Sequence, residues 1–266
     1  MESSPAPWIG ALRRSHDALQ AAVEPLGLGQ LEQLSYASEW SIAQVLSHLG
    51  SQAEIFGLFL DAGLTGQDPP GPDAFGPIWA TWNAKDPQAQ ASDALRADQA
   101  TVERFESLDA DEQARVHLHM FGMDLGATGL ARMRLGEHAI HTWDVLVALD
   151  PAATVAPDAV ALLIGQLDQL VARTARPDGK QRRIRVSTSH PERQFILATD
   201  EAVTLTASDD ETAAELGQSE LGQSELRLPA EAFVRLIYGR LDAAHTPPVE
   251  NVGVELDELR PIFPGF

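Results

Sequence analysis

Cysteine is absent from the 266-residue sequence. This absence excludes disulfide bonds, thiolate metal sites and a cysteine nucleophile supplied by the protein itself. Any metal site must therefore use histidine, aspartate or glutamate, and a reaction that needs sulfur must receive it from another molecule.

Positive charge and long apolar runs are also scarce. Lysine and arginine number 19 against 39 acidic residues, which gives a formal net charge of −20. A protein with this negative charge is expected to bind nucleic-acid phosphates and anionic membrane surfaces poorly. No run of about 18 apolar residues occurs, and the first residues, MESSPAPWIGALRR, lack the pattern of a secretory signal. We therefore expect a soluble cytoplasmic protein with no nucleic-acid or membrane partner.

The first 150 residues show helical spacing of apolar side chains. The pattern predicts helices over 8–23, 42–64, 74–107 and 126–149, the third with a break near Pro87. Ser41 and Gln44 form a capping-box pattern before the second helix. Four main helices in this length predict a helix bundle over residues 1–150.

Residues 151–266 have a different pattern. A linker-like stretch at 150–159 is followed by a predicted helix over 158–174, strand-like alternation around 184–205, and a helix that begins near Pro229. We therefore predict an α+β protein of two domains, with a small α+β domain at 151–266. The pentapeptide LGQSE occurs twice in tandem, at 216–220 and 221–225, which we interpret as a slipped duplication in a surface loop.

The densest group of ionisable residues lies on the fourth predicted helix, in RMRLGEHAIHTWD at 132–144. At about 100° per residue, Glu137, His141 and Asp144 share one sector, which continues a stripe expected to face the bundle core. An ionised carboxylate there must be paired, protonated or bound to a metal.

Spacing leaves three arrangements open for this group. Glu137 could pair with Arg134 while His141 is an ordinary core histidine; Glu137 and His141 could bind a metal; or His138 and His141 could chelate it. EHAIH lacks the HExxH order of metalloproteases. His48, on the second predicted helix, would complete a three-ligand site with an open position, as in catalytic metal centres.

Two motifs resemble those of a known family. WSIAQVLSHL at 40–49 resembles the second-helix motif of DinB-like metal-binding bundles, and RLGEHAIHTWDV at 134–145 is similar to their R-x-x-E-x-x-x-H-x-x-D motif. The whole chain resembles the mycothiol-dependent maleylpyruvate isomerase family. That resemblance implies a DinB-like four-helix bundle followed by a domain akin to the sterol carrier protein fold, with LPAEAFVRLIYGRLD at 228–242 as its closing helix.

The resemblance also implies a ligand set and a reaction. It assigns His48, Glu137 and His141 to a divalent ion, usually zinc, and leaves His138 outside the metal shell. Mycothiol would be the thiol cosubstrate, and its metal-bound thiolate would add to an electrophilic small molecule. Expulsion of the thiol after rotation gives cis–trans isomerisation, and retention gives S-conjugation; the motifs do not choose between them.

Three further residues are candidates for catalysis. We expect Arg235 and Arg240, both placed on the closing helix, to bind an anionic substrate or the thiol, although either could simply pair with Glu231 or Asp242. Asp144 could orient a metal-bound histidine or form a salt bridge. A metal-dependent hydrolase and a non-catalytic metal- or small-molecule-binding protein stay open as alternative functions.

Overall fold

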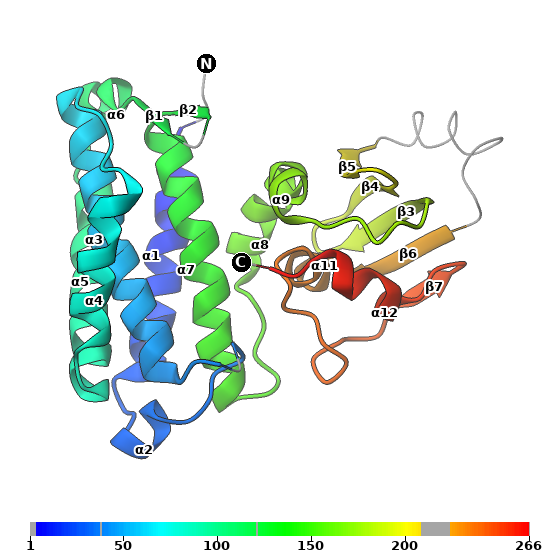
Figure 1. The fold of residues 1–266 in the computed structure, drawn as a ribbon, viewed down its shortest axis with the longest axis horizontal. Helices are drawn as coiled ribbons and strands as arrows, with labels where there is room; N and C mark the ends of the chain where they lie inside the picture. Colours follow the sequence, from blue (N-terminus) through cyan, green and yellow to red (C-terminus); the bar gives the residue numbers. More distant parts are fainter. Residues whose placement is uncertain (1–3, 38, 121, 209–223, 266) are drawn as a thin grey trace. The chain divides into compact units, whose positions relative to one another are not determined.

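The structure is a computed structural model that describes residues 4–37, 39–120, 122–208 and 224–265. The chain divides into two compact units, Met1–Ala159 and Val160–Phe266, and the division falls within helix α8 (Pro157–Leu163). The first unit is built mainly of helices and the second around a sheet (Figure 1), so the predicted α+β class is confirmed. That residues 1–150 form a domain able to fold by itself stays a prediction.

Four long helices dominate the N-terminal unit and lie side by side (Figure 1). Helix α1 packs on α7, and α3 packs on α5 and also contacts α7. Shorter elements connect them. The long helices are α1 (Ala6–Val23), α3 (Ile42–Thr65), α5 (Pro87–Glu106) and α7 (Ala127–Leu149); the shorter elements are α2 (Leu28–Leu31), η1 (Pro72–Ala74), α4 (Phe75–Asn83), α6 (Ala110–Arg115) and the hairpin of β1 (Leu118–Met120) and β2 (Met123–Leu125).

Local sequence signals define where α3 and α5 begin. Ser41 Oγ accepts a hydrogen bond from the backbone N–H of Gln44, and Gln44 Oε1 accepts one from the N–H of Ser41, which confirms the capping box. The predicted break near Pro87 is also confirmed. Asp86 caps α5 by accepting a hydrogen bond from the N–H of Ala89, and Pro87 occupies the first turn, where no N–H is needed.

One tryptophan attaches the short helix α4 to α3. The ring of Trp82 lies so close to Gly50 that a Cβ atom there would meet it at 2.3 Å. The indole N–H donates a hydrogen bond to Glu54 Oε2 over 3.0 Å, and the ammonium of Lys85 lies 3.5 Å from the ring centroid. The position of α4 on the bundle therefore depends on the absence of a side chain at residue 50.

The C-terminal unit contains a mixed sheet with strand order β5-β4-β3-β6-β7 among the described residues. Strands β3 and β6 are parallel, and the other neighbours are antiparallel. The predicted strands around 184–205 are present, whereas β6 and β7 were not predicted. The elements are β3 (Arg182–Ser189), β4 (Arg193–Thr199), β5 (Val203–Ala207), β6 (Ser224–Pro229), β7 (Glu250–Val252), η2 (Ile164–Gln166), α9 (Leu167–Thr174), α11 (Ala230–Ile237), α12 (Leu256–Leu259) and η3 (Arg260–Ile262).

The closing helix is shorter than predicted. Helix α11 ends at Ile237, and Gly239 follows with a φ of 71°. The N–H of Gly239 donates to the carbonyl of Leu236, and the N–H of Arg240 donates to that of Arg235, which is a Schellman motif. The placement of Arg240 on this helix was therefore wrong, because the left-handed glycine ends the helix first.

Two further sequence-based expectations concern the tandem repeat and membrane-spanning helices. The tandem LGQSE repeats lie outside the described residues except for Ser224 and Glu225, which begin β6. Within the described residues, none of the helices is both long and apolar enough to cross a membrane.

Candidate metal centre

Three residues singled out in the sequence come together in the N-terminal unit. His48 on α3 faces Glu137 and His141 on α7, and we call this group the open triad. His48 Nε2 lies 3.3 Å from Glu137 Oε2, and His141 Nε2 lies 3.8 Å from the same oxygen. The two imidazole rings meet edge to face, with centroids 4.6 Å apart. Two nitrogens and a carboxylate oxygen thus converge from two helices.

The open triad is sheltered but reachable from solvent. The side chains of His48 and Glu137 are 20% and 24% exposed, whereas that of His141 is 4% exposed. The indole of Trp40 lies beside both histidines, with ring centroids 5.4 Å from His48 and 6.4 Å from His141. A small ligand can therefore reach the triad without unfolding the bundle.

Asp144 fixes the orientation of His141. Its Oδ2 lies 2.9 Å from His141 Nδ1, and the carboxylate is fully buried. When Nδ1 carries the proton and donates a hydrogen bond to this carboxylate, the lone pair of Nε2 is free on the side of Glu137. A histidine held in this way by a carboxylate is typical of metal sites.

The electrostatics of the open triad favour metal-binding protonation states. Burial lowers the pKa of His48, against the opposing effect of its hydrogen bond with Glu137. Burial alone would raise the pKa of Glu137, but its hydrogen bond with His48 and its electrostatic interactions with His141, His48 and Arg134 outweigh burial and lower that pKa. Near neutral pH the group therefore offers a neutral imidazole at His48 and an ionised carboxylate, a donor set that fits zinc or a similar divalent ion.

The hydrogen bonds of Arg134 favour partners other than Glu137. Arg134 is fully buried and donates from Nη2 to Asp98 Oδ1 over 2.7 Å and to the carbonyl of Leu49 over 3.1 Å. His138 also points elsewhere, with its Nδ1 2.8 Å from Ser15 Oγ. The ligand-like atoms nearest to Glu137 are those of the two histidines of the open triad.

Comparison with known proteins identifies the family of the N-terminal unit. The sequence model of the family described as mycothiol maleylpyruvate isomerase N-terminal domain matches residues 12–146, just over half of the chain. The chain belongs to this family. The matched region includes all three residues of the open triad. A search of the curated proteins found no match.

Solved structures extend the likeness to the second unit. A crystal structure of the mycothiol-dependent maleylpyruvate isomerase superposes with a TM-score of 0.68 and 13% sequence identity, covering 95% of each chain. A mutant of that enzyme in which one histidine is replaced by alanine gives the same values. At this identity the likeness establishes the two-unit fold over nearly the whole length of this family member.

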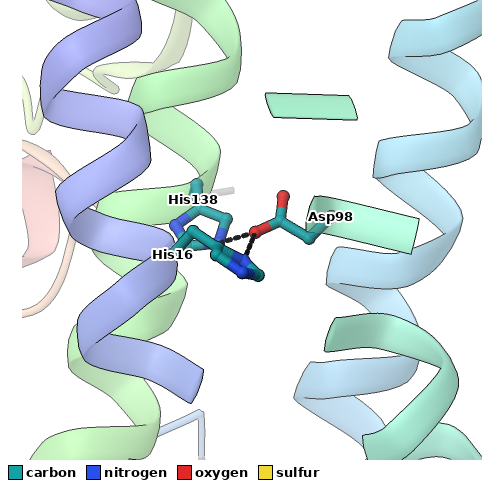
Figure 2. Close-up of side chains that lie close together, drawn as sticks. All are labelled: His16, Asp98 and His138. Atoms are coloured by element: carbon teal, nitrogen blue, oxygen red, sulfur yellow. Dashed lines mark hydrogen bonds and ion pairs between the residues drawn. The ribbon is translucent and has the colours of Figure 1, made fainter. Parts of the chain in front are cut away.

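This member of the family has a second histidine–carboxylate group, which the sequence analysis missed. His16 on α1 and His138 on α7 converge on Asp98 of α5 (Figure 2), and we call this group the sealed triad. His16 Nδ1 and His138 Nε2 each lie 2.7 Å from Asp98 Oδ2, and all three side chains are at most 2% exposed. The available signal was Asp98 itself, which lies on the same stripe of α5 as Ala91, Ala94 and Thr101.

The two arginines predicted to act in catalysis are held within the C-terminal unit. Arg235 forms a bidentate ion pair with Glu231, at 2.7 and 3.0 Å, and also donates to the carbonyls of Arg240 and His245. Arg240 donates to the carbonyl of Tyr238 over 3.0 Å. Both side chains are buried, so each has a clear structural task, and their role in substrate binding stays a prediction.

Proposed function

We propose that the chain is an enzyme that uses mycothiol and a divalent metal ion to act on an electrophilic small molecule such as maleylpyruvate. The observation that carries this proposal is the convergence of His48, Glu137 and His141 from α3 and α7 at a partly open position of the bundle. Membership of the family and the names of the structural neighbours supply the thiol and the substrate class.

The residues of the open triad would hold the ion. Asp144 keeps His141 in the required tautomer, and Trp40 shields one side of the two imidazoles. A bound zinc ion would supply Lewis acidity, which lowers the pKa of a thiol from about 8.5 and so provides a thiolate at neutral pH. Because the chain has no cysteine, the sulfur must come from the cosubstrate.

The reaction that follows depends on the fate of the carbon–sulfur bond. A thiolate that adds to one carbon of a cis double bond leaves a single bond between the two carbons, which can rotate. Expulsion of the thiolate then restores the double bond in the trans form and regenerates the thiol. If the bond to sulfur is kept and the neighbouring carbon is protonated, the product is an S-conjugate. We propose the isomerase outcome as the first choice, because it is the activity that the structural neighbours are named for.

Arg235 and Arg240 remain proposed contributors through their positive charge. A substrate with carboxylates needs cations, and the chain is strongly acidic overall. Replacing either arginine by lysine keeps the charge but removes the bidentate geometry. An activity that survives Arg235→Lys and falls with Arg235→Met, in a protein that stays folded, would support the charge; equal loss in both variants would assign the residue to structure.

The test of the proposed function combines metal analysis with a thiol-dependent assay. The purified full-length protein should contain about one divalent ion per chain and should convert maleylpyruvate only when mycothiol is present, with activity lost in a chelator and restored by zinc. Regenerated thiol identifies the isomerase, and stoichiometric consumption of thiol identifies the transferase. Equal turnover without any thiol would replace the proposal by a metal-dependent hydrolase.

A further inference from the structure

A pocket opens beside the open triad, within the N-terminal unit. Its volume is about 480 Å³, which lies in the range of small-molecule binding sites. His48 forms part of its wall, so the pocket and the open triad share a residue. The other lining residues come from the segment before α3, from α3 itself, and from α4 and α5: Trp40, Gln44, Ser51, Trp79, Asn83 and Gln90.

Among the residues that the structure describes, those that line this pocket include no lysine, arginine, aspartate or glutamate. It consists of indoles, carboxamides, one hydroxyl and one imidazole, in a chain that carries 58 formally charged side chains, 19 basic and 39 acidic. A charged group placed here would lose hydration without gaining an oppositely charged partner from the wall. The pocket therefore fits an uncharged ligand, or the uncharged part of one.

Two tryptophans give the pocket flat apolar surfaces. Trp40 is 38% exposed and Trp79 is 43% exposed, although large aromatic rings are usually covered in folded proteins. Trp79 packs against Phe75, with ring centroids 5.9 Å apart. Open indole faces are suited to stacking against the CH face of a saturated ring.

The carboxamides provide the polar part of recognition. Gln44 Oε1 accepts from the N–H of Ser41, and Asn83 Oδ1 accepts from Ser47 Oγ over 3.1 Å. Both bonds use the carbonyl oxygen, so the NH₂ groups are the donors that these side chains can offer to ligand hydroxyls. Flat apolar faces together with neutral donors match a polyhydroxylated ring, which has an apolar face and a rim of hydroxyl groups.

We propose that this pocket binds the neutral, polyhydroxylated rings of the thiol cosubstrate, while the sulfur-bearing end reaches the open triad past His48. This inference rests on the proposed function, in which mycothiol supplies the thiol. Mycothiol carries its cysteine on an amino sugar joined to inositol, so its ring portion has the chemistry that the pocket matches. Trp79 and Asn83 then act in binding the cosubstrate, at a distance from the bond that reacts.

The experiment measures ring recognition separately from thiol chemistry. The probe is S-methylmycothiol, which keeps the rings but cannot form a thiolate, and its binding to the full-length protein is followed by calorimetry. Trp79→Ala should weaken binding about tenfold, and Trp79→Phe should retain most of it because a flat ring remains. In the assay, Trp79→Ala should raise KM for mycothiol by a similar factor and leave kcat within about threefold.

A matched control separates this effect from the loss of any exposed apolar side chain. Leu58 is 40% exposed on α3 and does not line the pocket, so Leu58→Ala should bind S-methylmycothiol like the unaltered protein. Equal affinity of Trp79→Ala and the unaltered protein, with both folded, would overturn the pocket assignment while leaving the metal and thiol proposal intact. Thiol-independent turnover would overturn the proposed function instead, and probe binding would still report on the pocket.

Discussion

The open and sealed triads each combine two histidines with one carboxylate and each include at least one residue of α7, yet their surroundings differ. In the open triad, His48 and Glu137 are partly exposed, and the described ion pairs of Glu137 are with histidines. In the sealed triad, Asp98 is buried and already bound by the guanidinium of Arg134, 2.7 Å from its Oδ1. A divalent cation would meet that positive charge and would have to enter through a closed core.

The difference shows that two histidines and a carboxylate do not define a metal site by themselves. In the sealed triad the charge of Asp98 is balanced by Arg134, and the histidines, with Ser15 and Thr142 beside His138, complete a hydrogen-bonded group that joins α1, α5 and α7. In the open triad a carboxylate faces histidines at a partly exposed position. The first arrangement stabilises the bundle, and the second leaves a charge for an ion to balance.

The largest expected effect separates the triads by metal content. His141→Ala should reduce bound metal and mycothiol-dependent activity by more than about 100-fold, because removing a ligand should cost more than removing its hydrogen-bond partner. Elemental analysis of the purified variants measures the first effect. His138→Ala, three residues away on the same helix, is the control and should keep its metal. Metal lost from His138→Ala and kept in His141→Ala would reverse the comparison.

Folding stability should depend more on the sealed triad than on the open triad, the reverse of the expectation for metal content. Asp98→Asn leaves the Arg134 charge buried without its counter-ion and should lower the free energy of unfolding by about 3–5 kcal/mol. In metal-free protein, the partly exposed Glu137→Gln should lower it by less than about 1 kcal/mol. Denaturant melts of the two variants in a chelator check this, and equal destabilisation by both would remove the structural distinction between the triads.

A smaller effect is expected from Asp144, which touches the open triad without belonging to it. Asp144→Asn should weaken zinc affinity about 10- to 100-fold, because His141 loses the carboxylate that fixes its tautomer. Competition with a chromophoric chelator measures the affinity. An unchanged zinc affinity in a folded Asp144→Asn protein would show that His141 is oriented by other contacts.

The smallest effect is a pH dependence of the sealed triad. Burial would raise the pKa of Asp98, but the charges of His138 and Arg134 and its hydrogen bonds hold that pKa well below its usual value. A carboxyl group whose folded pKa is depressed contributes stability above its unfolded pKa, about 3.9, and loses it as the pH falls below that value. Metal-free protein should therefore lose up to about 1.4 kcal/mol per pH unit from this group below pH 4. Asp98→Asn should lack that component in urea melts between pH 3 and 5.

The sequence predicted those parts of the fold that depend on local signals. The Ser41 capping box and the break before Pro87 were visible because caps and prolines act within a few residues. Strand β6 was missed because its short alternation begins inside the duplicated segment and runs directly into α11. The end of α11 at Ile237, just before Gly239, was missed because a glycine within an apolar pattern does not reveal its φ angle.

The candidate site was predicted less completely, because its residues lie far apart in the sequence. Glu137 and His141 share a helix face by spacing alone. His48 became a candidate because a helix bundle can bring its second and fourth helices together, and the family resemblance then implied it as a ligand. The residues of the sealed triad meet only when α1, α5 and α7 pack together, so no pattern within a single segment predicts it. Spacing along the helix offered only Glu137 as a partner for Arg134, because its partner Asp98 lies 36 residues away in the sequence.

The contact of Trp82 with Gly50 has a consequence for how relatives of this protein can diverge. Helix α4 carries Trp79 and Asn83, and it is fastened to α3 where residue 50 has no side chain. One added methyl group there would displace the wall of the proposed cosubstrate pocket, whereas Glu137 and His141 on α7 are held by other contacts. Under the two proposals, selectivity for the cosubstrate would reside mainly on α4 and the reactive chemistry mainly on α7, with His48 as the residue common to both, so that evolution could change the first and keep the second.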